Sequence, residues 1–185
     1  MTSASGRPTD VPRRARGHEP PPGRSEGGSH RSAKHGGFQV KPVFVDADVL
    51  ICAEDGAHPK KQAAALAWME ALWRERAGRL STQVLNEFYV ALTTRHKPPM
   101  PQGDARAKLR RYNAWEPWRI DQATVETAWA VEARHALPYW DCLLVACAQH
   151  SGCTVVLSES LPHDAQYGTV RVVNPLKLAP EELKE

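Results

Sequence analysis

The sequence has few cysteines and no long apolar run, and each shortage excludes a class of protein. Its four cysteines stand inside apolar segments, away from the spacing of a disulfide scaffold: Cys52, Cys142, Cys147 and Cys153. A reducing, cytoplasmic environment is therefore expected. No apolar run, such as the one over 143–148, extends beyond seven residues, whereas a membrane span needs about 20. We expect no transmembrane helix, and no secretory signal, because no apolar stretch follows the N-terminal arginines.

Several common catalytic motifs are also missing. The chain has no glycine-rich phosphate loop, no nucleophile elbow and no HExxH motif. Cys142, Cys147, His150 and Cys153 suggest zinc at first sight. However, Cys142 and Cys147 are five residues apart, about 140° around a helix, so they do not converge on one ion. Buried thiols are expected instead.

Charge and composition divide the chain near residue 40. Residues 1–40 carry a net charge of +4, seven of the 12 glycines and almost no large apolar side chain, whereas residues 41–185 have a net charge of −1. We therefore expect a disordered, basic Pro/Gly-rich tail over 1–40, one domain over 41–176 and a short C-terminal extension over 177–185. The tail could be an RNA-contacting arm, a solvated extension or the product of a misassigned start codon.

Within the domain, short apolar runs alternate with helical patterns. The runs 43–45, 154–157 and 170–173 are typical of buried parallel strands, and Leu80–Thr82 could form another. Helices are expected from Pro59 to a C-terminal Gly78, from Ser81 or Thr82 onward, and over 104–112, 121–136 and 141–150. This order predicts an α/β fold with a central parallel sheet of about four to five short strands flanked by helices.

Acidic residues occur where these elements begin or end. Asp46 and Asp48 follow the first strand, Glu87 borders an apolar helix face, and Asp141 precedes the run 143–148. Each has an ordinary alternative role: Asp46, Asp48 or Asp141 could cap a helix, and Glu87 could reach solvent. Taken together, clustered carboxylates repel one another unless a divalent cation neutralises them, and oxygen ligands favour Mg²⁺ or Mn²⁺.

Four segments in register resemble the PIN-domain ribonucleases, and in particular the VapC-type toxins of bacterial toxin–antitoxin pairs. The segments are VFVDADVL (43–50), LSTQVLNEFYV (80–90), PYWDCLLVACA (138–148) and VLSESL (156–161), followed by a closing strand at VRVVNP (170–175). The resemblance spans about residues 42–176. It implies a PIN-like fold and a metal-dependent endoribonuclease, a hydrolase that cleaves RNA phosphodiester bonds.

The same resemblance assigns roles to individual residues. Asp46, Glu87 and Asp141 match the catalytic, metal-binding acids of the family, which hold Mg²⁺, with Mn²⁺ as a possible substitute. Asp48 falls at a position that supports the metal or contacts substrate. Ser160 stands where the family commonly has an aspartate, and its neighbour Glu159 could replace that acid. The basic residues Arg106, Lys108, Arg110 and Arg111 could hold phosphates or simply form a solvated helix face.

The expected partners also follow from the resemblance. They are an RNA substrate, a small cognate antitoxin and a second copy in a homodimer, with no membrane. The alternative is a catalytically weakened PIN module that binds RNA or an antitoxin without cutting. Six tryptophans suggest base stacking. Trp68, Trp73 and Trp129 have the spacing of core residues, so Trp115 and Trp118 are the expected surface candidates.

Overall fold

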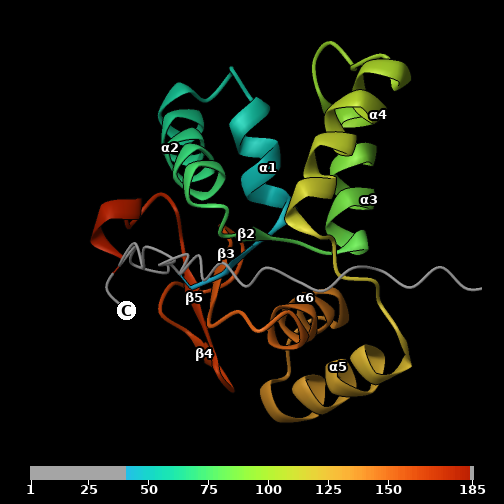
Figure 1. Ribbon diagram of the computed structural model, residues 1–185, viewed down its shortest axis with the longest axis vertical. Helices are drawn as coiled ribbons and strands as arrows, with labels where there is room; N and C mark the ends of the chain where they lie inside the picture. Colours follow the sequence, from blue (N-terminus) through green and yellow to red (C-terminus); the bar gives the residue numbers. More distant parts are fainter. Residues whose placement is uncertain (1–40, 184–185) are drawn as a thin grey trace, which may run out of the picture. The chain divides into compact units, whose positions relative to one another are not determined.

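The computed structural model describes residues 41–183, which form one α/β unit (Figure 1). The predicted tail over 1–40 lies outside the described residues, as do the last two residues of the predicted extension over 177–185. The strands are β1 (Val43–Val45), β2 (Gly78–Arg79), β3 (Val155–Leu157), β4 (Gln166–Tyr167) and β5 (Val170–Val173). The helices are α1 (Ala47–Glu54), α2 (Pro59–Glu75), α3 (Thr82–Val90), α4 (Gln102–Arg111), α5 (Gln122–His135) and α6 (Tyr139–His150). A π-helical turn, Ala91–Arg95, continues α3, and two 3₁₀ turns cover Tyr112–Trp115 and Pro180–Glu182.

The strands form one sheet in the order β2-β1-β3-β5-β4. All neighbouring pairs are parallel except β4 and β5, which form a tight antiparallel hairpin at one edge. In this order β2 is the neighbour of β1 on one edge, and β3 is its neighbour on the opposite edge. The predicted α/β fold with a central, mainly parallel sheet is therefore confirmed, including the strand at 170–173.

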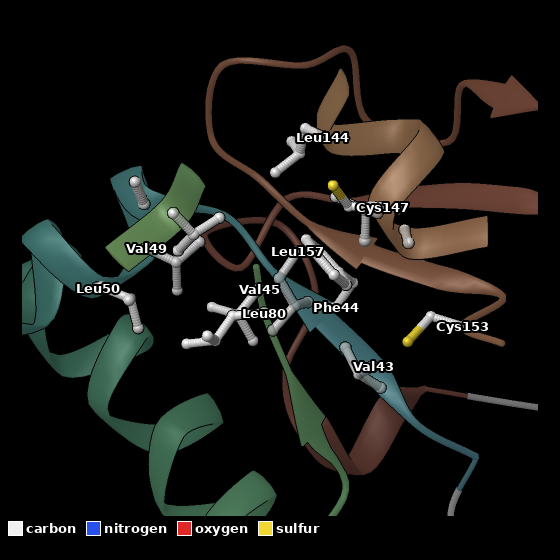
Figure 2. Close-up of a cluster of buried hydrophobic side chains, with 14 of the residues drawn as sticks. Val43, Phe44, Val45, Val49, Leu50, Leu80, Leu144, Cys147, Cys153 and Leu157 are labelled. Atoms are coloured by element: carbon white, nitrogen blue, oxygen red, sulfur yellow. The ribbon is translucent and has the colours of Figure 1, made fainter. Parts of the chain in front are cut away.

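Helices cover both faces of this sheet (Figure 1). The α1–α2 pair lies on one face, and α6, which packs closely against α5, lies on the other. Figure 2 shows the apolar layer between them, where Val43, Phe44 and Val45 of β1 meet Leu80, Leu144 and Leu157. The central strands are buried on both faces, which explains their continuous apolar runs.

The cysteines contribute to this core as free thiols. Cys142, Cys147 and Cys153 are buried and Cys52 is half-buried. Figure 2 places the Cys147 and Cys153 side chains among the apolar residues. Burial raises the pKa of Cys147 to about 11 and that of Cys153 to about 12, so both are neutral, small apolar side chains at physiological pH.

The helix predicted from Pro59 corresponds to α2, but the residue predicted to end it is wrong. Arg76, and not Gly78, takes the left-handed conformation that ends α2, with φ of 54°. Gly78 lies two residues further on, in β2, which covers only Gly78–Arg79. The strand predicted at Leu80–Thr82 was therefore misplaced, because β2 ends before Leu80 and Thr82 is already the first residue of α3. A Cβ atom on Gly78 would lie 2.5 Å from ring atoms of Trp115. The glycine is therefore required by close packing against an indole ring and not by helix termination.

Helix starts agree better with the sequence, because polar caps define them. Ser81 caps α3 by accepting a hydrogen bond from the Val84 amide, and Asp121 caps α5 through the Thr124 amide. Helix α6 begins at Tyr139 after Pro138, so Asp141 lies in its first turn and is not the cap. No helix within residues 41–183 is both long and apolar enough to cross a membrane.

Candidate active site

The site forms where the path of the chain reverses direction across the sheet, between β1 and β3. Val45 and Leu157 are paired in the parallel register, so the next residues, Asp46 and Ser158, emerge side by side at the carboxyl ends of the two strands. Ser158 Oγ donates a hydrogen bond of 2.8 Å to Asp46 Oδ2. Open α/β sheets bind ligands at such a point because the two crossovers leave a crevice there.

Asp46 has two functions in the structure. Its Oδ1 accepts a hydrogen bond of 2.6 Å from the Ala47 amide, so it is the N-cap of α1, as one sequence interpretation proposed. It is also buried, with only 7% of its surface exposed. Burial, together with the charges of Asp48 and Glu87, raises the pKa of Asp46 to about 8. A carboxylate held in this way is costly to ionise unless a cation is nearby.

Asp48 binds the loop that follows β3. Its Oδ2 accepts hydrogen bonds of 2.9 Å from the amides of Glu159 and Ser160. Burial raises the pKa of Asp48, although these amides oppose the shift. Its other oxygen, Oδ1, is buried and has no hydrogen-bond partner among the described residues. Asp48 therefore fixes the loop with one oxygen and leaves a second, unsatisfied acceptor at the site.

Glu87 reaches the site from α3, where Gln83 holds it. Gln83 lies one turn earlier, and its Nε2 donates 2.8 Å to Glu87 Oε1 and 3.2 Å to the carbonyl oxygen of Trp140. Gln83 is buried whereas Glu87 is exposed. One amide group thus links the Glu87 carboxylate to the start of α6. Gln83 was not among the predicted site residues, although its spacing of four residues from Glu87 is a recognisable signal of a side-chain contact on a helix.

Asp141 enters from the first turn of α6 and is half-buried. Burial raises its pKa. The N-terminus of a helix carries a partial positive charge, which favours an acid in this turn. Asp141 thus lies at the edge of the site, on a helix that packs directly against the sheet.

These side chains line one cavity of about 720 Å³. Its wall includes all three predicted catalytic acids, together with Asp48 and Ser160. The remaining lining is Ala47, Ile51, Thr82, Gln83, Asn86, Val90, Arg95, Ile120 and Trp140. Among residues 41–183, however, no three His, Cys, Asp or Glu side chains are close enough together to hold a metal ion. The fold therefore gathers the acids around one space without drawing them into a tight cluster.

Glu159 is directed elsewhere. Its carboxylate forms an ion pair with Lys61 of α2 and accepts a hydrogen bond of 3.1 Å from Cys52 Sγ. The bond from Lys61 is the main reason that the pKa of Glu159 is lowered. Glu159 is absent from the cavity lining, whereas Ser160 is part of it, and Ser160 Oγ lies 3.0 Å from Ser158 Oγ. Ser160 and Glu159 were the two residues considered for the position where the family has a further aspartate. Only Ser160 faces the acids.

The basic residues proposed as phosphate contacts lie on α4, away from this cavity. Lys108 pairs with Glu54 at 2.6 Å and Arg106 donates to Gln102 on its own helix. Arg110 and Arg111 are exposed on the same helix. The basic residue that does line the cavity is Arg95, in the π-helical turn after α3. Arg106, Arg110 and Arg111 therefore fit the solvated-face interpretation, whereas Lys108 is half-buried in its ion pair.

The tryptophans are distributed differently from the prediction. Trp115 is buried, with 1% exposed, and Trp118 is half-buried with its Nε1 bonded to Thr124. Neither forms an open groove wall. Trp129, predicted in the core, is 55% exposed on α5. Trp140, adjacent to Asp141, is 63% exposed and lines the cavity. A helical pattern shows which residues share a face but not which neighbour covers that face.

Comparison with known families decides the identity of the fold. The family model described as "PIN domain" matches residues 43–159. The chain belongs to the PIN domain family. No curated protein sequence matches it. Several solved structures resemble this PIN domain, among them the following two. One is a toxin–antitoxin complex from Klebsiella pneumoniae, with 19% identity, a TM-score of 0.55 and coverage of 72% of this chain and 97% of that one.

The second solved structure is VapC20 of Mycobacterium tuberculosis, described as a sarcin–ricin loop cleaving toxin. It has 20% identity and a TM-score of 0.51, and the match covers 70% of this chain and 98% of that one. Both likenesses support the fold. The resemblance between the four sequence segments and PIN domains is thereby confirmed at the level of family.

The donor chemistry of the cavity fits a hard divalent cation. The acids offer carboxylate oxygens. Within residues 41–183, no cysteine or histidine lines the space, and Asp48 Oδ1 is buried without a hydrogen-bond partner. The raised pKa of Asp46 reflects burial beside like charges, a situation that a bound cation relieves. Oxygen-only donors favour Mg²⁺ or Mn²⁺ over zinc or copper.

Proposed function

We propose that this PIN domain is a metal-dependent endoribonuclease that acts as the toxin of a toxin–antitoxin pair. The observation that carries the proposal is the common cavity reached by Asp46 from β1, Glu87 from α3 and Asp141 from α6. These are the three acids that the PIN resemblance assigns to catalysis. Their position at the carboxyl ends of parallel strands is where α/β proteins bind substrate.

In this proposal Mg²⁺ or Mn²⁺ would be held by Asp46, Glu87 and Asp141, which line one cavity but, among residues 41–183, are not drawn into a tight cluster, with Asp48 supporting the site. When bound, such an ion lowers the pKa of a water and stabilises negative charge at phosphorus. The protein supplies the positioning. Ser158 and the Ala47 amide fix the Asp46 carboxylate, and Gln83 fixes Glu87. Arg95 lies on the cavity wall and can contact a phosphate of the RNA backbone.

A small antitoxin is the expected regulator. The Klebsiella structure, which shares the fold, is described as a toxin–antitoxin complex. We further propose that the protein works in the cytoplasm, where its RNA substrate would be, and that it forms a homodimer. Light scattering of the purified protein, alone and after co-expression with a small neighbouring gene, tests both associations. A monomer in both samples would contradict both.

A cleavage assay tests the enzymatic proposal. Purified protein is incubated with RNA in Mg²⁺ or Mn²⁺, and EDTA is added to a parallel sample. Cleavage is expected with the metals, absent with EDTA, and abolished in Asp141→Asn, whose melting temperature serves as the folding control. Full activity of Asp141→Asn would remove this residue from the mechanism.

One observation favours the alternative, a PIN module that binds RNA or an antitoxin without cutting. Ser160 occupies the place of the usual fourth acid, and it lines the cavity where that charge would lie. A site with one carboxylate fewer holds a divalent cation less tightly. RNA binding without cleavage, even at high Mn²⁺ concentration, would support this alternative and exclude the nuclease.

A further inference from the structure

Trp140 is the most exposed large apolar side chain among the described residues, with 63% of its surface open to solvent. It is located on the wall of the acid-lined cavity and immediately precedes Asp141. An indole ring left open at a surface loses the stabilisation that burial would provide. Trp129, the next most exposed at 55%, lies on α5 and is not part of the cavity wall.

The surroundings of Trp140 hold it in place. Its ring contacts that of Tyr139, with centroids 5.6 Å apart and planes inclined by 64°. Its carbonyl oxygen accepts the 3.2 Å hydrogen bond from Gln83, the same residue that holds Glu87. The backbone at Trp140 is therefore tied to the residue that holds a proposed catalytic acid, and Tyr139 packs against the indole ring. A side chain positioned in this way loses little conformational freedom when a flat ligand stacks on it.

The rest of the cavity wall combines surfaces of two kinds. Ile51, Val90 and Ile120 add apolar area to that of Trp140, and the acids and Arg95 line the same cavity. Within residues 41–183, Arg95 has neither an ion pair nor a side-chain hydrogen bond. A nucleotide has the same combination, a flat base attached to a charged phosphate. The wall therefore suits a base on its apolar part and the backbone on its polar part.

We infer that the Trp140 ring stacks on an unpaired base next to the phosphate to be cleaved, and so positions the substrate. This inference rests on the proposed ribonuclease function and adds to it a residue that positions the substrate. A paired base inside a duplex is stacked on its neighbours and presents no face to an indole. The substrate is therefore a single strand or a loop, whose bases can turn outward. Trp140 is a substrate-positioning residue and takes no part in bond breaking.

The test uses the full chain and three variants: Trp140→Ala, Trp140→Phe and the matched control Trp129→Ala. A fluorescently labelled single-stranded RNA and the same sequence in a duplex are titrated by anisotropy in EDTA. Trp140→Ala is expected to weaken single-strand binding by about 5- to 150-fold, the range for loss of one stacked base. Trp140→Phe is expected to stay within about threefold of wild type because it keeps an aromatic face. Trp129→Ala should be unchanged.

Two further readouts separate stacking from a structural role. RNA binding should quench tryptophan emission in wild type and in Trp129→Ala, but not in Trp140→Ala. In Mn²⁺, Trp140→Ala should raise KM more than it lowers kcat. Equal binding by Trp140→Ala and Trp129→Ala would overturn the inference, as would Trp140→Phe binding as weakly as Trp140→Ala.

The inference and the proposed function can fail separately. Wild-type protein that binds single-stranded RNA through Trp140 but never cleaves it would overturn the nuclease and leave the stacking role standing. Wild-type protein that cleaves RNA with no effect of Trp140→Ala would leave the nuclease standing and overturn the stacking role. Absence of both binding and cleavage would overturn both.

Discussion

Lys61 of α2 and Glu159 of the loop after β3 form an ion pair that keeps the Glu159 carboxylate outside the acid-lined cavity. Cys52 adds a hydrogen bond to the same carboxylate. The amide of Glu159, by contrast, points back to Asp48, as does the amide of Ser160. The loop is therefore fixed with Ser160 toward the acids and Glu159 away from them.

A metal titration tests the consequence for Ser160. Ser160→Asp adds a carboxylate to the cavity wall and is expected to lower the metal concentration for half-maximal cleavage by about 10- to 150-fold, since one charge-assisted interaction is worth about 1.5–3 kcal/mol. Glu159→Gln is the matched variant and should leave this concentration nearly unchanged. The measurement is RNA cleavage against Mg²⁺ and Mn²⁺ concentration, with Mn²⁺ expected to be the better activator. An unchanged titration for Ser160→Asp and a shifted one for Glu159→Gln would make Glu159 the fourth acid.

Asp46 should make the metal-free protein less stable at higher pH. Its pKa is raised from 3.8 in the unfolded chain to about 8 in the folded protein, so the folded state binds more protons between these values. Stability therefore falls as pH rises through this window. Asp46→Asn should remove this dependence and raise the melting temperature at pH 8 by several degrees, since about 1 kcal/mol shifts a domain of this size by about 2–4 °C. Asparagine keeps the N-cap of α1.

Thermal unfolding in EDTA at pH 5 and pH 8 measures this effect. Asp121→Asn is a suitable control because Asp121 is also an N-cap, but its pKa is lowered by hydrogen bonds from Thr124. This shift has the opposite sign, so Asp121→Asn should lose stability where Asp46→Asn gains it. Equal melting temperatures for wild type and Asp46→Asn at pH 8 would show that ionising the buried Asp46 carboxylate does not destabilise the fold.

Gln83 should support catalysis without contacting the reacting phosphate. Gln83→Leu removes the hydrogen bonds that hold Glu87 and the Trp140 carbonyl, and loss of such a supporting residue typically costs 10- to 100-fold. We expect a fall of about this size in kcat, with the protein still folded. Gln122→Leu is a matched control because Gln122 makes the same contact to Glu126 on exposed α5. Wild-type kcat in Gln83→Leu would mean that Glu87 needs no support.

Arg95 should contribute one phosphate contact. Arg95→Gln is expected to reduce the slope of log affinity against log salt concentration by about 0.7, the value for one contact to a single strand. Arg110→Gln, an exposed arginine on α4, should leave the slope unchanged. Anisotropy titrations with single-stranded RNA at several salt concentrations provide the slopes. If Arg110→Gln reduces the slope of log affinity against log salt concentration and Arg95→Gln does not, the RNA backbone lies along α4.

Much of the site could be predicted from sequence because its chemistry is local. An acid after an apolar strand, as at Asp46, is visible in a short window, and parallel strands place such residues at one edge of the sheet. Three further acids, Asp48, Glu87 and Asp141, also line the common cavity. The strands at Val43–Val45 and Val170–Val173 were similarly evident, because burial on both faces requires a continuous apolar run.

Other features depended on neighbours that are distant in the sequence. Lys61 and Glu159 are 98 residues apart, and their ion pair, together with the amide bonds to Asp48, turns Ser160 toward the cavity. Gly78 is explained by Trp115, and Trp140 remains exposed while Trp115 is enclosed. Helical spacing fixes the angle of a side chain around its own axis, but whether another element covers that side chain depends on packing across the whole domain. The sequence alone therefore determined the family and the acids, whereas the tertiary structure decided which side chains surround them.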